Sequence, residues 1–399
     1  MIRLLLRNAK VIIEKEVIEH GYVYIENDKI KSFGTLANLP SLQEEVQVIH
    51  LSDEDTIAPG FIDVHIHGVG GADTMDGTMD ALSTMATTLP AEGTTSFLAT
   101  TITQGEESIS TALKNVANYC NAANSPGKAE ILGVHLEGPF INVKKAGAQP
   151  KNEITAPNIN LFKKWQEEAD GLIKLVTLAP EVENGIELIE YLSSTQVISS
   201  IGHSDATYEQ VERAVEAGAS HVTHLFNGMR GIHHREPGVA GSALLFKELI
   251  IEMIVDGIHI DPQIVRLALQ SKGVDGTILV TDSMRAKCLK SGEYELGGQP
   301  VTVKDGKALL SDGTLAGSIL KMKQAVQNIV DYTNISLVEA IQLVTVNPAK
   351  QLNIYDRKGS IEIGKDADLV VLNKELDVTL TLCRGIKAYE KELIKDENY

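Results

Sequence analysis

The sequence predicts an α/β protein, a (β/α)8 barrel with a small β-sandwich domain formed from both termini. Apolar segments alternate with helical segments through the middle of the chain, which is typical of a parallel sheet covered by helices. Both ends of the chain contain strand-like segments instead. Imidazole or carboxylate side chains stand where several apolar segments end, and barrels of this class build their sites at such strand ends. These observations predict both the architecture and the place of the functional site.

The domain division follows from the same pattern. The chain is long enough for a barrel of about 250 residues and one smaller domain. We expect residues 1–55 to form the N-terminal part of the small domain, residues 56–355 a metal-dependent barrel, and residues 356–399 the C-terminal part. In the first part, Asn27 and Asp28 lie between alternating apolar segments and indicate a hairpin.

The candidate barrel strands are eight apolar segments, at residues 56–68, 94–102, 130–141, 172–181, 196–204, 220–229, 249–259 and 277–283. Helical patterns lie between them. For the helix at residues 208–219, Asp205 or Thr207 can cap the start, and Gly218 is placed to end it. A segment rich in Gly, Lys and Asp, residues 285–315, is predicted to be an insertion or a hairpin after the last barrel strand.

Composition and charge exclude several classes of partner. The net charge of −18 argues against nucleic acid or an anionic membrane. This charge would also repel an anionic substrate, so a local cationic pocket would have to bind one. No segment approaches the ~20 apolar residues of a membrane span, and we find no signal-peptide pattern. The three cysteines have no metal-type spacing and suit a reducing compartment, so we expect a cytoplasmic protein.

The candidate metal donors lie at the ends of predicted strands. His65 and His67 are two apart on a strand, so both side chains point to the same face. Glu137 ends the segment GVHLE, His203 ends ISSIGH, and Asp282 ends TILVTD. Each residue alone would be an ordinary polar group at a strand end. Their occurrence at the ends of several different strands indicates a metal site.

A further histidine pair, His221 and His224, is three residues apart, so the two side chains are expected to face opposite ways. We assign His224 to the site because it is nearer the C-terminal end of its strand. Imidazole and carboxylate donors without sulfur suit zinc, iron or manganese. The predicted donors divide into two metal subsites: His203 and His224 on one, His65 and His67 on the other, with Glu137 bridging them and Asp282 beside the metal-activated water.

The motifs resemble those of the amidohydrolase superfamily. PGFIDVHIHG, HLEGPF and the tail NPAKQLNIYDRKGSIEIGKDADLVVL carry this resemblance. The motifs IGHSDA, THLFNGM, HHREPG, DGIH and LVTDSM add a resemblance to the N-acetylglucosamine-6-phosphate deacetylase family along nearly the whole chain. The resemblance implies hydrolysis of N-acetylglucosamine 6-phosphate to glucosamine 6-phosphate and acetate in amino-sugar catabolism and recycling. It also implies a divalent transition metal, one or two per subunit.

The resemblance further implies a phosphate site and a homodimer. Arg235 and the backbone amides of Asn227 and Gly228 are the candidates to bind phosphate, and His259 is a candidate to contact the sugar or the phosphate. The family suggests that the loop around Arg235 reaches the site of the neighbouring subunit. An ion pair between Arg235 and Glu236 is the alternative for this residue.

Three more residues have expected roles. The chain departs from the family at Gln149, where some members carry a histidine. Gln149 offers no imidazole to polarise or position the acetyl group, and a metal ion could polarise the carbonyl instead. His135 shares a face with Glu137 and is expected to support the site rather than bind metal. Asp282 is expected to act as a general base and then as a general acid.

Two other functions are alternatives. A cyclic-amide hydrolase of the dihydroorotase or hydantoinase type commonly carries a bridging carboxylated lysine on the fourth strand. Here Lys174 lies near the start of that strand, far from the predicted mouth. A metal-free scaffold relative without catalysis is the other alternative, and the complete set of donors argues against it.

Overall fold

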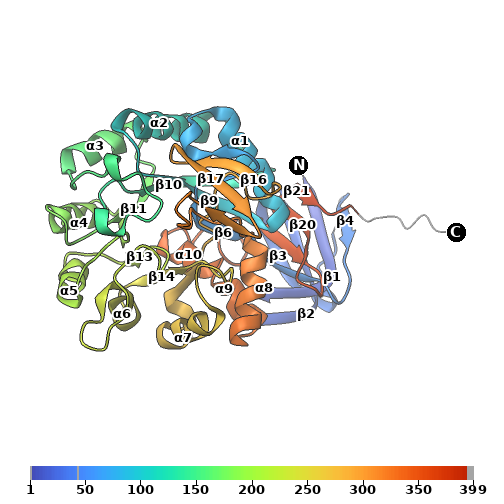
Figure 1. Cartoon of the computed structure of the whole chain (residues 1–399). Helices are drawn as coiled ribbons and strands as arrows, with labels where there is room; N and C mark the ends of the chain where they lie inside the picture. The colour runs from blue at the N-terminus through green and yellow to red at the C-terminus, as the bar shows by residue number, and fades with distance from the viewer. Residues whose placement is uncertain (1, 43–44, 393–399) are drawn as a thin grey trace.

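The computed structural model describes residues 2–42 and 45–392, so residues 1, 43–44 and 393–399 of the predicted terminal domain lie outside it. A barrel ringed by helices occupies one side of the molecule, and a sheet built from both ends of the chain lies beside it (Figure 1). Within residues 2–42 and 45–392, every helix is too short or too polar to span a lipid bilayer.

Eight parallel strands form the barrel, and each pairs with the next one in the sequence. They are β6 (Phe61–Ile66), β9 (Thr94–Thr101), β10 (Glu130–Glu137), β11 (Ile173–Leu178), β12 (Ile198–Ile201), β13 (His221–Val222), β14 (Ile250–Met253) and β15 (Thr277–Leu279). The first and last strands meet through a parallel bridge between Ile66 and Ser283. Across the same seam, the N–H of Asp282 donates to the carbonyl of His65 at 2.8 Å. The predicted barrel is confirmed, and two predicted donors meet where it closes.

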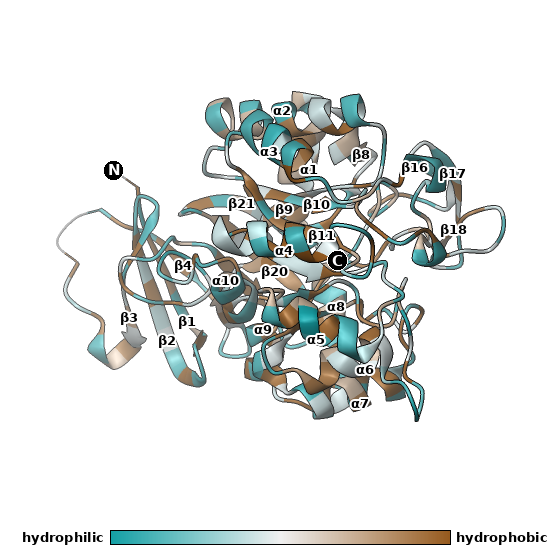
Figure 2. Ribbon diagram, turned by 90° about the vertical axis from the view of Figure 1, so that its left-hand side faces the viewer, coloured by the Kyte–Doolittle hydropathy of each residue, from teal (hydrophilic) through white to brown (hydrophobic). Residues whose placement is uncertain are grey.

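Helices surround the barrel strands (Figure 1). They are α1 (Met79–Thr88), α2 (Glu106–Ala122), α3 (Ile159–Glu168), α4 (Gly185–Ser194), α5 (Tyr208–Glu216), α6 (Gly238–Leu245), α7 (Pro262–Lys272), α8 (Met322–Thr333), α9 (Leu337–Gln342) and α10 (Val346–Gln351). Thr207 caps α5 as predicted, because its side chain accepts the N–H of Gln210. Hydrophilic and hydrophobic residues alternate along the outer helices in Figure 2, as expected of helices with one face packed on the strands.

The two ends of the chain form one small β-domain, as predicted, and its strands belong to a single mixed sheet. Its strands are β1 (Arg3–Ile13), β2 (Glu16–Glu26), β3 (Lys29–Thr35), β4 (Gln47–His50), β5 (Thr56–Pro59), β19 (Leu369–Leu372), β20 (Val378–Cys383) and β21 (Ile386–Glu390). The N-terminal strand β5 pairs with β1 on one side and with the C-terminal strand β19 on the other. Buried residues of both chain ends, such as Leu6, Val23 and Leu369, share one core. Each end of the chain therefore needs the other to complete this domain.

The apolar segment at residues 56–68 is divided in the structure. Its first residues form β5 of the terminal sheet, and the barrel strand β6 begins only at Phe61. The chain passes between the two sheets at Gly60, where a Cβ atom would lie 2.2 Å from Oγ1 of Thr95. Both strands are buried, so the apolar pattern gives no sign of the division. The structure thus places residues 56–59, predicted to belong to the barrel, in the terminal sheet.

The segment after β15 forms an antiparallel sheet of three strands, β16 (Gly292–Leu296), β17 (Gln299–Lys304) and β18 (Lys307–Leu309). It is the hairpin predicted within residues 285–315, and it projects from the side of the barrel opposite the terminal sheet (Figure 2). The remaining short elements are β7 (Gly68–Val69), β8 (Ala72–Asp73) and the 3-10 turns η1 (Leu36–Asn38), η2 (Thr74–Asp76), η3 (Leu89–Glu92), η4 (Val143–Lys145), η5 (Lys151–Glu153) and η6 (Val274–Gly276).

Candidate metal centre

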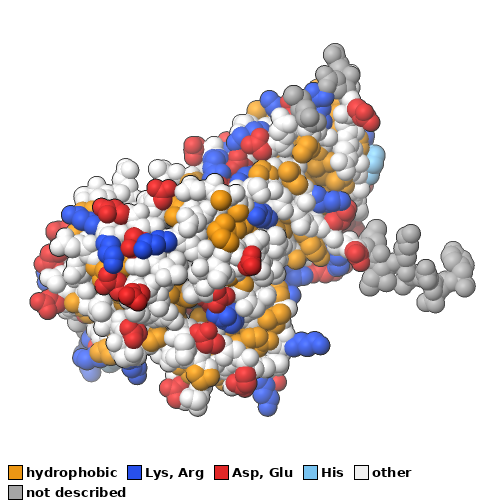
Figure 3. Space-filling view, turned by 90° about the horizontal axis from the view of Figure 1, so that it is seen from above, with side chains coloured by type: hydrophobic (Ala, Val, Ile, Leu, Met, Phe, Trp, Pro, Cys, Tyr) orange, Lys and Arg blue, Asp and Glu red, His pale blue; other side chains and the backbone are white. Residues whose placement is uncertain are grey.

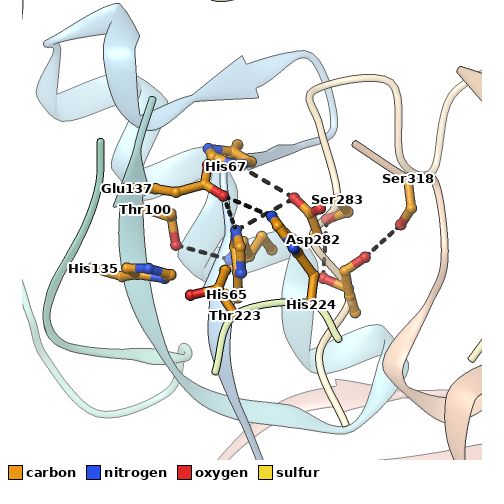
Figure 4. Close-up of polar contacts among 12 residues, drawn as sticks. His65, His67, Thr100, His135, Glu137, Thr223, His224, Asp282, Ser283 and Ser318 are labelled. Atoms are coloured by element: carbon orange, nitrogen blue, oxygen red, sulfur yellow. Dashed lines mark hydrogen bonds and ion pairs between the residues drawn. The ribbon is translucent and has the colours of Figure 1, made fainter. Parts of the chain in front are cut away.

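The predicted donors converge at the C-terminal end of the barrel strands. Figure 4 shows His65, His67, Glu137, His224 and Asp282 pointing toward one another. Glu137 is the last residue of β10, and His67 directly follows β6. Strands that run parallel bring their ends to one rim, so donors far apart in sequence become neighbours. The predicted metal constellation is therefore assembled by the fold.

Three donors lie just beyond their strands, on left-handed backbone. The φ angle is +48° at His203, +31° at His224 and +46° at Asp282. Such conformations cost about 1–3 kcal/mol each at non-glycine residues and concentrate at functional sites. They turn these side chains into the mouth of the barrel, independently of the alternation along the preceding strand.

This backbone turn overturns one prediction about the histidine pair on β13. His221 does not face away from the barrel, because its Nε2 lies 3.0 Å from Oε1 of the buried Glu252, which also contacts His65. Strand β13 ends at Val222, so strand alternation does not extend to His224. His224 belongs to the site as predicted, and His221 lies inside the barrel as well, below the mouth.

Among the described residues, two sets of potential ligand atoms lie at the mouth of the barrel, one formed by His65, His67 and Asp282 and the other by Glu137, His203 and His224. A third set, formed by His65, His135 and Glu252, shares His65 with the first. Within each set, the ligand atoms lie within 4.8 Å of one another. The two oxygens of Glu137 serve both sets at the mouth. Oε1 lies 3.2 Å from Nε2 of His203 and 3.1 Å from Nε2 of His224, whereas Oε2 lies 3.3 Å from Nε2 of His67. This is the bridging position expected for Glu137.

The hydrogen bonds of His203 test whether these residues fit a metal ion. Its Nδ1 lies 2.8 Å from the carbonyl oxygen of Lys145, so Nδ1 carries the proton of the neutral ring. Nε2 then presents a lone pair 3.2 Å from the Glu137 carboxylate and 3.1 Å from Nε2 of His224. Electron-rich atoms at these distances repel one another unless a cation lies between them. The donor set therefore fits a metal cation.

The local charge leads to the same conclusion. Burial lowers the pKa of His65, but the carboxylates of Asp282, Glu252 and Glu137 outweigh burial and raise the pKa to about 9. Burial likewise opposes the charged form of His67, yet Asp282 and Glu137 raise its pKa well above the ordinary value. The buried carboxylates thus create a field that favours positive charge. A metal ion would replace protons at these rings.

Gln149 contacts the bridging carboxylate directly. Its Oε1 accepts the N–H of Thr103 at 2.8 Å, which orients the amide so that Nε2 donates to Oε2 of Glu137 at 2.7 Å. The side chain is buried and also lines the cavity above the donors. A glutamine at this position therefore holds Glu137 in its bridging orientation.

A cavity opens above the donors. Four predicted substrate residues, Gln149, Asn227, Gly228 and His259, line its wall. Nδ1 of His259 lies 2.7 Å from Oδ2 of Asp256, which fixes the ring. Gly228 has φ +58°, and a Cβ atom there would lie 2.9 Å from Nδ1 of His203, so only glycine fits. These contacts give the cavity a fixed wall on the side of the loops that follow β13 and β14.

One phosphate candidate is corrected by the structure. The backbone N–H of Asn227 donates to the carbonyl of His224 at 3.0 Å, so this amide closes a turn. The prediction that it offers a hydrogen bond to phosphate is therefore wrong. The side-chain amide of Asn227 also points back, donating to the carbonyl of Leu225 at 3.2 Å. Its contribution to the cavity wall is steric in this conformation.

Arg235 lies outside this cavity. Its side chain is exposed, and Nη1 lies 2.9 Å from Nε2 of His234. The predicted alternative, an ion pair with Glu236, is wrong. Oε1 of Glu236 instead accepts the backbone N–H groups of Tyr208 at 2.8 Å and Gly238 at 3.0 Å. Arg235 is thus presented to the surroundings on a loop that Glu236 stabilises.

His135 is buried beside the donors, where its predicted supporting role would place it. Its Nδ1 donates to the carbonyl of Val64 at 3.2 Å, so its Nε2 accepts the hydroxyl of Thr177 at 2.7 Å. Burial lowers the pKa of His135 well below its ordinary value, which keeps the ring neutral. Its ring centroid lies 4.5 Å from that of His65. Both ring nitrogens take part in hydrogen bonds, which favours the predicted supporting role of His135 over metal binding.

Sequence reasoning missed two buried carboxylates beneath the donors. Oε2 of Glu252, which lies on β14, is 2.9 Å from Nδ1 of His65. Asp63 on β6 accepts the hydroxyl of Thr281 at 2.6 Å and so links the first and last strands. In both cases the available signal was a lone acidic residue inside an apolar barrel strand. Such a residue must find a partner in the interior.

Lys174 lies where the sequence suggested, away from the mouth. It is exposed near the start of β11, and its Nζ donates to the carbonyl of Gly171 at 3.2 Å. A carboxylated lysine at this position could not bridge metals at the opposite end of the strand. The bridge is available from Glu137 instead.

Comparisons with known proteins agree with this geometry. The profile of the amidohydrolase family matches residues 56–388. The N-acetylglucosamine-6-phosphate deacetylase of Bacillus subtilis is 50% identical over 387 residues, 97% of this chain and 97% of that protein. The enzyme of the same name from Lysinibacillus sphaericus is 47% identical over 329 residues, 82% of this chain and 84% of that protein. A mutant N-acetyl-D-glucosamine-6-phosphate deacetylase of Mycobacterium smegmatis, solved in complex with N-acetyl-D-glucosamine-6-phosphate, has a TM-score of 0.90 at 31% identity, covering 97% of this chain and 100% of that one.

Proposed function

The chain belongs to the amidohydrolase family, and we propose that it hydrolyses N-acetylglucosamine 6-phosphate to glucosamine 6-phosphate and acetate. The observation that carries this function is the pair of donor sets that share Glu137 beneath a cavity. Relatives along nearly the full length of the chain are deacetylases of this substrate. The reaction is therefore hydrolysis of a linear amide in amino-sugar catabolism and recycling.

Two metal subsites are the arrangement that the donors favour. His203, His224 and Glu137 would hold one ion, and His65, His67 and Asp282 would hold the other. A bound divalent metal would polarise the amide carbonyl and lower the pKa of a nearby water. Imidazole and carboxylate donors suit zinc, iron and manganese alike.

Asp282 is the residue placed to move the proton. Burial raises the pKa of its carboxyl group, but His65 and His67 outweigh burial and hold the pKa below its ordinary value. The carboxylate can therefore accept a proton from the attacking water. It can then donate that proton to the amide nitrogen as the C–N bond breaks, which lets the sugar leave as a neutral amine.

Phosphate recognition must rely on close contacts. The net charge is −18, and acidic and basic side chains are interspersed on the face seen in Figure 3. His259, Gly228 and the side of Asn227 belong to the cavity of the same subunit. We propose that Arg235, exposed on its loop, completes the phosphate site of a neighbouring subunit in a homodimer. An arginine can bind phosphate through two parallel hydrogen bonds.

Two alternatives lose support. The cyclic-amide alternative would need a bridging lysine at the mouth end of the fourth strand, but Lys174, the lysine of β11, lies near the opposite end of that strand. A metal-free scaffold would give no reason for the Nε2 lone pair of His203 to face the buried carboxylate of Glu137. The cytoplasmic location stays a prediction from the cysteines.

The function is tested by acetate release from N-acetylglucosamine 6-phosphate, measured beside unphosphorylated N-acetylglucosamine and dihydroorotate. We expect rapid release from the phosphorylated sugar, much slower release from the free sugar and no opening of the cyclic amide. Equal rates for the two sugars would remove the phosphate site from the proposal. Hydrolysis of dihydroorotate alone would replace the proposed function with the cyclic-amide alternative.

A further inference from the structure

A buried carboxylate below the metal subsites has only nitrogen donors around it. Glu252 is fully buried on β14. Its Oε1 accepts the Nε2–H of His221 at 3.0 Å. Its Oε2 accepts both the Nδ1–H of His65 at 2.9 Å and the backbone N–H of His224 at 3.1 Å. One oxygen thus holds a residue from each of the two donor sets.

The contact with His65 determines which ring nitrogen of His65 is free. A carboxylate oxygen accepts hydrogen bonds, so Nδ1 of the neutral ring carries the proton and Nε2 presents its lone pair. That Nε2 lies 3.5 Å from Oε1 of Glu137 and 3.4 Å from Oδ1 of Asp282, and it has no hydrogen-bond partner among the described residues. Glu252 therefore fixes both the orientation and the tautomer that a metal ligand at this position requires.

The contact with His224 acts on the backbone. His224 has φ +31°, and its Nε2 must turn toward Oε1 of Glu137, 3.1 Å away. The bond from its N–H to Glu252 holds the chain in this conformation immediately after β13. His221 completes the arrangement, because its ring keeps the carboxylate of Glu252 from rotating away from His65. His135 cannot substitute, since both of its ring nitrogens are already used.

We propose that Glu252 is a positioning residue for both metal subsites, with its larger effect on the subsite of His65, His67 and Asp282. This inference rests on the proposed metal-dependent function. Glu252 orients His65 directly, whereas it reaches the second subsite only through the backbone of His224. Removal of Glu252 should therefore weaken the two subsites unequally.

The geometry also predicts how conservative substitutions behave. In Glu252→Gln, the side-chain NH2 group cannot take the place of Oε2. The backbone N–H of His224 points to that place, so two hydrogen-bond donors would face each other. The NH2 group must face His221, whose ring can change tautomer and accept it. The hydrogen bond to His65 then survives without the negative charge. Glu252→Leu removes both the hydrogen bond and the charge.

The experiment is a titration of the chelator-stripped full chain with Co2+, followed by competition with a chelator and by the visible absorption of the bound ion. The wild type should bind more than one equivalent. Glu252→Leu should bind the weaker equivalent about 10–100-fold less tightly, the range for partners that orient metal-ligating histidines. The affinity of Glu252→Gln for this equivalent should lie between those of the wild type and Glu252→Leu. The tighter equivalent should be less affected in both variants.

Glu92→Gln is the matched control, because Glu92 is a buried carboxylate that pairs with Lys287 at 2.7 Å and forms no hydrogen bond or ion pair with any of the donors. It should lower thermal stability and leave both Co2+ affinities unchanged. A wild type that binds two equivalents, with unchanged affinities in Glu252→Leu, would overturn the inference alone. If Glu252→Leu does not fold, equal affinities of Glu252→Gln and the wild type would overturn it. A wild type limited to one equivalent would overturn the two-metal function and this inference with it.

Discussion

Replacing Asp282 by asparagine removes a proton acceptor and leaves the surroundings in place. The backbone at Asp282 is fixed from both sides, because its N–H donates to the carbonyl of His65 at 2.8 Å and its carbonyl accepts the N–H of Ser318 at 2.7 Å. Asparagine has nearly the same shape as aspartate, so these bonds remain. The remaining difference is the loss of a negative charge and of a basic oxygen at the mouth of the barrel.

The size of the effect follows from the position of the carboxylate. Oδ1 of Asp282 lies 3.4 Å from Nε2 of His65 and 3.3 Å from Nε2 of His67, and its side chain is 11% exposed against 3% for Glu137. It is thus the donor most open to the cavity. General acid–base catalysis contributes about two to four orders of magnitude. Turnover of Asp282→Asn should fall by that factor, a barrier increase of about 2.7–5.4 kcal/mol at about 1.36 kcal/mol per tenfold change.

The assay is steady-state acetate release at saturating substrate, with the metal content of the same samples measured by elemental analysis. Ser283→Ala is the control, since Ser283 follows Asp282 in the same loop. Its hydroxyl donates to the carbonyl of Gly68 at 3.0 Å and contacts none of the candidate metal ligands. It should stay within tenfold of the wild type. Near wild-type turnover in a metal-replete Asp282→Asn protein would refute the assignment of Asp282 as the base. Loss of metal from that protein would assign Asp282 to ligation instead.

Three further predictions concern the metals, the phosphate and the core. His203→Ala should reduce activity more than His65→Ala in metal-supplemented turnover assays, because the subsite of Glu137, His203 and His224 is the one we expect to be indispensable. Arg235→Ala should lower kcat/KM for the phosphorylated sugar by the equivalent of about 2–5 kcal/mol and leave the unphosphorylated sugar nearly unaffected. Mixing Arg235→Ala with Asp282→Asn subunits should restore activity if the loop crosses a dimer interface. Lys287→Met should reduce the free energy of unfolding in urea by about 3–5 kcal/mol, because it leaves the buried carboxylate paired with Lys287 without a counter-charge.

Each of these predictions has an opposite outcome. Equal losses in His203→Ala and His65→Ala would mean that neither subsite dominates. A parallel decrease for both sugars in Arg235→Ala would make this arginine structural, and a mixture without rescue would place it in its own subunit's pocket. The core prediction would be wrong if the double variant Lys287→Met, Glu92→Gln were no more stable than Lys287→Met alone.

The barrel could be predicted from the sequence because each strand is an apolar segment bounded by a turn or a helix cap. The donors could be predicted because they stand at the C-terminal ends of these segments, where Glu137 and His203 interrupt the apolar pattern. Parallel strands bring such ends together whatever their separation in the chain. Polar residues at the ends of apolar segments therefore predict a shared site in the folded barrel.

Glu252 could not be assigned in the same way. It lies within the segment IIEMIV rather than at its end, so the rule that finds donors at strand ends does not apply. Its partners, His65 and His221, come from two other strands. The sequence shows that a buried acidic group needs a partner, but the identity of the partner depends on the register between strands.

Backbone conformation at the site was the other feature that the sequence could not predict. His224 and Asp282 adopt left-handed φ angles that no local sequence signal marks at these residues. The continuous apolar run through Gly60 likewise gave no sign that the chain changes sheets there, because the strands on both sides are buried. Such features depend on close contacts between segments, such as the approach of Thr95 to Gly60, and appear only in the folded chain.

The most direct test of the central claim is acetate release from N-acetylglucosamine 6-phosphate during titration of chelator-stripped protein with zinc, iron(II) or manganese. Two donor sets that share Glu137 predict no turnover without metal and a rate that reaches its maximum only beyond one equivalent per chain. A maximum at one equivalent would contradict the two-metal site. Full turnover by the metal-free protein would contradict the whole account.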